Sequence, residues 1–253
     1  MEKFTKKSAT LLTALTLIPV LGGVLSVSAD DVASYNSTGS ITFQAGTQVT
    51  TPVDPSNPTQ PVDPVDPENS IDPGTAGPLS IDFASNWNFG TQDVTAQDTV
   101  YNAQPQALSD GTAVPLYAQV TDTRGTFEGW ALSLTQDSQF EDDSNNQLTG
   151  AQLSFKGVGK TASTSDVQAS NVQDSSFDLT PGVEQPLLSA NVDEGTGTNT
   201  YAFGDISDYD TSATDGVVAA SKSPVHLSVK GGSMRATNYT THLVWTLSDT
   251  PAP

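Results

Sequence analysis

The sequence contains no cysteine and few basic residues. Its 253 residues include 9 Lys and Arg against 29 Asp and Glu, which gives a formal net charge of −20 at pH 7. Without cysteine there is no disulfide scaffold, thiolate metal site or Cys nucleophile, so the fold must rest on its hydrophobic core. The acidic excess excludes nucleic-acid binding, which needs clustered Lys and Arg to replace counterions on phosphates. Only two histidines remain as candidates for general-base chemistry.

The composition favours short strands and turns over long helices. The chain has 20 Gly, 16 Pro and 35% hydrophobic residues, a proportion that is low but sufficient for a β-rich globule. These features predict an acidic, turn-rich, extracellular protein.

The two ends of the chain predict secretion without a covalent anchor. Basic residues precede an apolar stretch over residues 11–25, and Val27-Ser28-Ala29 supplies the small residues of a cleavage site. This is the pattern of a secretory signal peptide over residues 1–29, with Asp30 as the mature start. The C-terminus, Pro251-Ala252-Pro253, shows no sorting motif and no hydrophobic tail. We therefore expect a secreted protein that something non-covalent must hold at the surface.

Two different segments follow the signal peptide. Residues 30–50 form a short N-terminal segment, in which residues 36–46 could make a small hairpin with Ile41 and Phe43 on one side. Residues 51–76 are rich in Pro and Asp, and prolines recur every three residues from position 52 to 67. This period matches polyproline II, so we expect an extended, semi-rigid spacer. A ligand for a proline-recognising module is disfavoured, because no Arg or Lys lies beside the prolines.

Residues 77–253 have the pattern of one all-β, sandwich-like domain. Short apolar alternations are separated by Gly, Asn, Asp and Ser. The alternation places His226 and His242 on the polar faces of their strands, so neither is expected to be catalytic. Residues 136–147 and 159–176 are polar and are expected to form loops. The strand candidates are residues 114–120, 130–134, 152–156, 186–192, 200–204, 224–230 and 239–247.

No catalytic residue, cofactor or metal site is predicted. No G-x-S-x-G elbow is present, and no pair of carboxylates can be singled out for glycoside hydrolysis. The acidic clusters lack the spacing of an EF-hand loop, so solvated loops are expected, with a calcium site as the alternative. These clusters are Glu141, Asp142 and Asp143, and Asp205, Asp208 and Asp210.

Two Trp-x-Leu steps distinguish the domain, Trp130-Ala131-Leu132 and Trp245-Thr246-Leu247. Residues i and i+2 of a strand share a face, so each step places an aromatic beside an aliphatic side chain. Two interpretations stay open from the spacing alone. The pairs could pack in a sandwich core, or they could form an exposed stripe for sugar stacking or protein docking.

With these motifs the chain resembles WxL-domain surface proteins of Gram-positive bacteria. The resemblance covers the SITFQAG segment, the VDP repeats, GPLSIDFASNWNFG, EGWALSL and the terminal block from residue 225 to 251. It implies a non-enzymatic protein that attaches non-covalently to peptidoglycan and assembles with membrane-anchored partner proteins. An adhesin for host matrix proteins is the alternative. The candidate binding residues are Trp130, Leu132, Tyr239, Leu243, Trp245 and Leu247, and the resemblance does not say whether the tryptophans contact the glycan or hold the fold.

Charge constrains how such a protein could bind the wall. A strongly negative domain gains no attraction from anionic teichoic acids near neutral pH. Binding would then rest on hydrogen bonds from amides and hydroxyls, on aromatic stacking, or on bridging divalent cations. We expect binding to strengthen as carboxylates become protonated below about pH 5.

Overall fold

The computed structural model describes residues 33–251, so the predicted signal peptide lies outside the described residues. The chain divides into two units, residues 1–42 and 43–253. The described part of the first unit, residues 33–42, contains no strand or helix. Within residues 33–251, no helix has the length and hydrophobicity needed to cross a membrane.

The hairpin expected over residues 36–46 does not form. These residues contain no strand, and the side chains of Ile41 and Phe43 are 77% and 84% exposed. A two-stranded hairpin needs a further surface on which to bury its apolar side, and nothing within residues 33–251 covers these two side chains.

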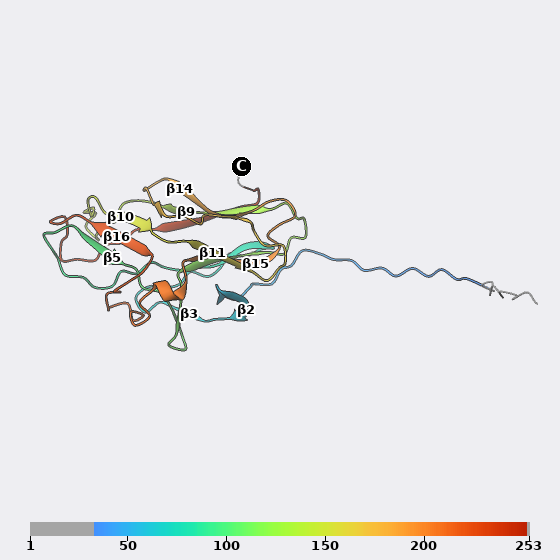
Figure 1. The fold of residues 1–253 in the computed structure, drawn as a ribbon. Helices are drawn as coiled ribbons and strands as arrows, with labels where there is room; N and C mark the ends of the chain where they lie inside the picture. Colours follow the sequence, from blue (N-terminus) through green and yellow to red (C-terminus); the bar gives the residue numbers. More distant parts are fainter. Residues whose placement is uncertain (1–32, 252–253) are drawn as a thin grey trace, which may run out of the picture. The chain divides into compact units, whose positions relative to one another are not determined.

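The second unit confirms the all-β prediction. Two antiparallel four-stranded sheets form its main layers. In the first the order is β11 (Gly159–Ser163), β15 (Gly197–Phe203), β8 (Tyr117–Asp122) and β4 (Leu79–Ala84). In the second it is β12 (Asn171–Val172), β14 (Glu184–Ala190), β9 (Trp130–Gln136) and β17 (Leu243–Ser248). Edge strand β11 contacts β12 and edge strand β4 contacts β17, as expected for two stacked sheets. Figure 1 shows β9 and β14 of the second sheet in one layer and β11 and β15 of the first sheet in the other.

Smaller elements extend the two layers. A third four-stranded sheet has the order β13 (Phe177–Asp178), β10 (Gln152–Phe155), β16 (Val225–Val229) and β5 (Thr99–Asn102). A three-stranded sheet contains β3 (Pro64–Val65), β6 (Gln106–Leu108) and β7 (Ala113–Val114). A two-stranded sheet pairs β1 (Val53–Asp54) with β2 (Asn57–Pro61), and a single 3-10 turn, η1, spans Ile206–Asp208.

The core lies between the layers and is filled by inward-facing residues of the alternating strands. Phe203 is at its aromatic centre, with its ring 5.2 Å from Tyr201, 5.3 Å from Phe155 and 5.1 Å from Trp87, each in an edge-to-face arrangement. Such geometry directs a ring edge at the electron-rich face of its neighbour and adds to the energy of apolar burial. The residues around this centre include Leu116, Val120, Trp130, Leu132, Leu134, Leu153 and Val225.

The proline-rich segment is not the extended spacer expected from its period. Pro55 and Pro58 are buried, and strands β1 and β2 pair with each other. The amide side chain of Gln119 accepts a hydrogen bond from Val53 N–H at 2.8 Å and donates one to Thr51 C=O at 3.0 Å. The prolines prevent a long ladder of strand hydrogen bonds, as the period of three predicts. Each proline nevertheless keeps a carbonyl that can accept a hydrogen bond and an apolar ring that can be buried. The folded unit therefore includes the proline-rich segment and does not begin at residue 77.

Two further strand predictions need correction. The last strand begins at Leu243 and not at Tyr239, although the predicted alternation continues, with Tyr239 partly buried and His242 exposed. Thr240 makes only an isolated bridge to Glu141. The polar stretch 159–176, expected to be a loop, contains strands β11 and β12. Their polar side chains suit edge positions, where one strand side faces water.

Candidate functional site

The first Trp-x-Leu step lies in the core. Strand β9 is flanked on both sides, by β14 and β17, and its residues Trp130 and Leu132 are 0% and 1% exposed. The indole Nε1 of Trp130 donates a hydrogen bond to Gly195 C=O at 3.0 Å. Neither side chain has a surface that a ligand could touch, which favours the core interpretation for this step.

Gly195 makes room for the indole. Its φ is +74°, in the left-handed region that glycine tolerates, and a Cβ there would lie 2.6 Å from Trp130 Nε1. A second donor, Asn199 Nδ2, reaches the same Gly195 carbonyl at 2.9 Å. The loop before β15 is therefore shaped around the buried tryptophan.

The second Trp-x-Leu step has a different environment. Trp245 pairs across the sheet with Leu134, and Leu247 pairs with Leu132. Both side chains pack against the core but stay half-buried, because β17 has β9 on one side only. The Trp245 ring lies 6.3 Å from Phe203 at an interplanar angle of 68°.

The remaining two predicted binding residues are also half-buried. Leu243 packs against the core at the start of β17. Tyr239 precedes that strand, and its hydroxyl accepts a hydrogen bond from the backbone N–H of Arg235 at 3.2 Å. The six predicted residues thus divide into two core residues on β9 and four half-buried residues on β17 and the segment before it.

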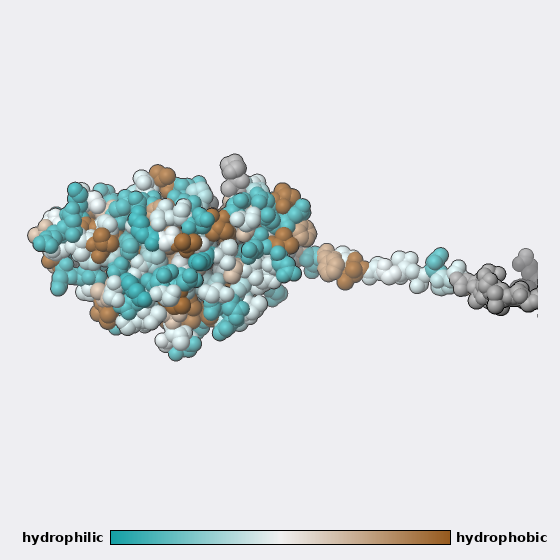
Figure 2. All heavy atoms as spheres, in the orientation of Figure 1, coloured by the Kyte–Doolittle hydropathy of each residue, from teal (hydrophilic) through white to brown (hydrophobic). Residues whose placement is uncertain are grey.

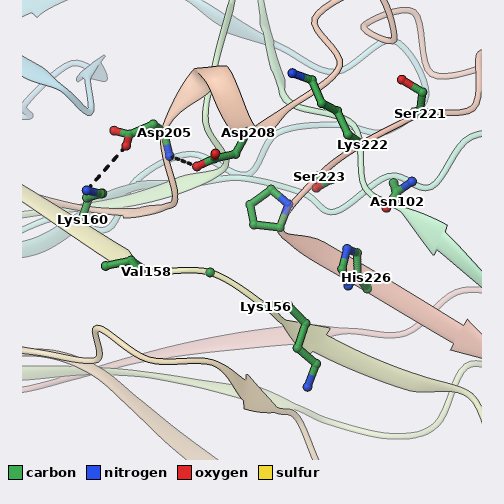
Figure 3. Close-up of a pocket in the computed structure, with 12 residues that line it drawn as sticks. Asn102, Lys156, Val158, Lys160, Asp205, Asp208, Ser221, Lys222, Ser223 and His226 are labelled. Atoms are coloured by element: carbon green, nitrogen blue, oxygen red, sulfur yellow. Dashed lines mark hydrogen bonds and ion pairs between the residues drawn. The ribbon is translucent and has the colours of Figure 1, made fainter.

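A polar pocket of about 520 Å³ lies elsewhere, at the end of the third sheet. The β10–β11 connection supplies one wall, η1 and the segment before β16 supply the others, and Figure 3 shows the side chains around the opening. Hydroxyl, amide, imidazole, ammonium and carboxylate groups line it together. The lining residues are Asn102, Lys156, Gly157, Val158, Lys160, Asp205, Asp208, Ser221, Lys222, Ser223, Pro224 and His226.

The lysines of the pocket are held by specific partners. Lys160 Nζ lies 3.5 Å from the Asp205 carboxylate, and Lys222 Nζ donates to Ser207 C=O at 2.9 Å. Lys156 forms an ion pair with Asp178. These side chains are half-exposed, so their ion pairs contribute little to stability and leave the ammonium groups accessible.

The sequence matches the family model described as the WxL domain, surface cell wall-binding, over residues 30–251. The chain belongs to the WxL family. No curated protein and no solved structure matches it. As a WxL domain it is a cell wall-binding domain of the cell surface, and the resemblance drawn from the two Trp-x-Leu steps is confirmed. The matched range begins well before residue 77, in agreement with the docked proline segment.

The acidic clusters of the WxL domain form hydrogen-bonded turns. The Asp142 carboxylate accepts bonds from the backbone N–H groups of Ser144 and Asn146. Asp210 accepts bonds from the hydroxyl of Ser212 and the backbone N–H of Ser221, which hold the pKa of its carboxyl well below the usual range. Within residues 33–251, no three His, Asp or Glu side chains gather in a group that could hold a metal ion.

The two histidines lie on the less buried faces of their strands, in line with the alternation. His226 also lines the pocket, which the strand pattern did not predict. The pocket was missed because its lysines come from positions 156, 160 and 222, and no local motif joins them. Trp87 was missed as a residue that packs against the core, although the segment SNWNFG was part of the family resemblance.

Proposed function

We propose that this WxL domain holds the secreted chain on the cell wall by binding peptidoglycan non-covalently at the polar pocket. The observation that carries this proposal is the gathering of lysine ammonium groups there, beside the carboxylates of Asp205 and Asp208. Three of the six Lys and Arg residues beyond residue 29 line the pocket, in a chain with a net charge of −20. Peptidoglycan presents hydroxyls, amides and peptide carboxylates, and the pocket presents complementary ammonium, amide and hydroxyl groups.

The buried tryptophan supports the pocket over an aromatic stripe. Stacking on a sugar needs an exposed ring face, and the side chain of Trp130 is fully buried. Leu132 is buried beside it, so the two Trp-x-Leu steps do not form a continuous exposed stripe. We therefore assign the first step a structural role and place the wall contact at the pocket.

Co-sedimentation of residues 30–253 with purified sacculi stripped of teichoic acid tests this assignment. The test variant is Lys156→Gln with Lys222→Gln, which removes two positive charges from the pocket. The matched control is Lys230→Gln with Arg235→Gln, which removes the same charge from residues outside the pocket lining. We expect the pocket variant to pellet at least about tenfold less at limiting sacculus concentration, as for the loss of one or two charge-assisted hydrogen bonds.

The control separates a local contact from a general charge effect. If both variants lose binding equally, net charge and not the pocket governs attachment. If the wild-type chain stays in the supernatant, peptidoglycan is not its ligand, and a membrane-anchored surface protein would have to hold it. We propose such proteins as additional partners because the family resemblance implies assembly with them.

A further inference from the structure

The segment before the folded unit exposes apolar side chains on an uncharged stretch of chain. No Asp, Glu, Lys or Arg occurs from residue 32 to 53. Ile41 and Phe43 are 77% and 84% exposed and alternate with polar residues, as on one face of a strand. Figure 2 shows brown hydrophobic residues in the part of this segment that is nearest to the folded unit. These two large apolar side chains are therefore available for burial against a partner.

Gly46 marks where this segment joins the folded unit. Its backbone N–H donates to Thr123 C=O at 3.0 Å, and in the described residues 33–45 no residue takes part in a strand. A Cβ on residue 46 would lie 2.5 Å from Thr123 Oγ1, so glycine permits this close approach. Residues 40–45, SITFQA, take part in no strand, and their backbone groups make no hydrogen bond to another backbone group of the described residues.

Strand β17 offers an open edge of matching length. It pairs with β9 on one side, and among the described residues no other backbone bonds to positions 243–248. Charged residues and proline normally protect an edge strand from pairing. The sequence of β17, LVWTLS, contains neither. Its side chains Leu243, Trp245 and Leu247 remain half-buried at this edge.

The other edge strands of the three four-stranded sheets are protected. Strands β12 and β13 have two residues each, and β11 carries Lys160. The outer side of β4 is occupied, because Thr75 N–H donates to Ile81 C=O at 2.8 Å. Strand β5 is bridged to Ala220 at Asn102. Among the described residues, five of the six edges of these sheets are therefore protected, and the edge of β17 is exposed. This favours β17 as the strand that accepts an added strand.

We propose that residues 40–45 of one copy add as a fifth strand to the open edge of β17 in a second copy. With Ile41 and Phe43 turned toward the core, the added strand covers Trp245 and Leu247 at the edge of the sandwich. Charge favours these two segments as the meeting point. Residues 32–53 and 236–248 are both free of Asp, Glu, Lys and Arg, so two copies meet there with the least like-charge repulsion.

The contact joins two different surfaces, so it is heterologous. Each copy has one donor segment and one acceptor edge, and repeated pairing builds a ring or a filament of surface domains. The partner is another copy of this chain, and no cell wall is needed for pairing. The inference therefore stands or fails independently of peptidoglycan binding at the pocket.

Sedimentation velocity of residues 30–253 over a range of concentrations tests the donor segment. The wild-type chain is expected to associate, and Ile41→Asp with Phe43→Asp is expected to weaken association by about tenfold to a hundredfold. The matched control is Tyr35→Asp with Val49→Asp. It adds the same charge at exposed apolar residues outside 40–45, and it is expected to associate almost as the wild type does. A wild-type chain that is monomeric at all concentrations would overturn the proposal.

Disulfide trapping tests the acceptor edge without background, because the chain has no cysteine. Thr42→Cys is mixed and oxidised with a second chain carrying Val244→Cys or Thr246→Cys, on exposed positions of β17. The control partner carries Val100→Cys, an exposed position on edge strand β5. A covalent dimer is expected with a β17 partner and not with the β5 partner. Equal trapping with both partners contradicts the proposal. A double variant, Thr42→Cys with Val244→Cys, also contradicts the proposal if its disulfide closes within one chain. The segment would then pair with β17 of its own chain and not with that of a second copy.

Discussion

Replacing Trp130 distinguishes a core tryptophan from a ligand-contacting one. In Trp130→Phe the smaller ring leaves part of the buried volume empty, and the Nε1–H bond to Gly195 C=O is lost. The Gly195 carbonyl does not become unsatisfied, because Asn199 Nδ2 still donates to it at 2.9 Å. We therefore expect the free energy of unfolding to fall by about 1–3 kcal/mol and Tm by roughly 2–12 °C.

Trp130→Ala removes the whole buried side chain and gives the upper limit of the loss in the free energy of unfolding. Its expected cost is about 3–5 kcal/mol, a large part of the stability of an ordinary domain. Trp245→Phe is the matched comparison on the other Trp-x-Leu step. Because Trp245 is only half-buried, its replacement should cost less than that of Trp130. Urea unfolding followed by far-ultraviolet circular dichroism measures all three variants.

The binding assay then decides between the two interpretations. At a temperature where Trp130→Phe is fully folded, its co-sedimentation with sacculi should equal that of the wild type. A variant that keeps wild-type stability and loses sacculus binding would refute the reasoning, because the indole would then contact the wall.

Gly195→Ala should lower the free energy of unfolding by about 1–3 kcal/mol or more in urea titrations, since it strains a positive φ and overlaps Trp130; an unchanged midpoint would contradict this packing. A chain that begins at residue 77 should be less stable in thermal melts than one that begins at residue 43, because it loses the docked β1–β2 pair; equal Tm values would restore the spacer interpretation. Burial raises the pKa of Asp82, so its contribution to stability is present below pH 3.8 and is lost as pH rises through the folded-state pKa; Asp82→Asn should lack this loss, and parallel pH profiles for variant and wild type would exclude it. Sacculus binding should strengthen below about pH 5 as wall and protein carboxylates become protonated, and a pull-down that is flat from pH 7 to 4 would contradict this.

The local alternation of apolar and polar residues was sufficient to predict the all-β class and the positions of most of the central strands. Alternation located β9, β10 and β16 within a few residues, and it placed Val244 and Thr246 on the outer face of β17. Alternation is readable because side chains of a strand point to opposite faces in turn, whatever the rest of the fold is.

The proline segment and the pocket depended on partners far away in sequence. Gln119 bonds to Thr51 and Val53 across more than 60 residues, so the proline period could not reveal that the segment docks. The pocket brings Lys156, Lys160 and Lys222 to one opening from separate strands and loops. Contacts of this kind come from chain topology and leave no periodic signal.

The two Trp-x-Leu steps separate what the sequence determines from what the tertiary structure determines. The sequence by itself determined that each tryptophan shares a strand face with its leucine, because that follows from a side-chain period of two. Only the tertiary structure decided that the steps differ. Strand β9 is covered by β14 and β17, so Trp130 is buried, whereas β17 is the last strand of its sheet and leaves Trp245 half-buried. Burial depends on strand order, and strand order is set by pairings between segments that lie far apart along the chain.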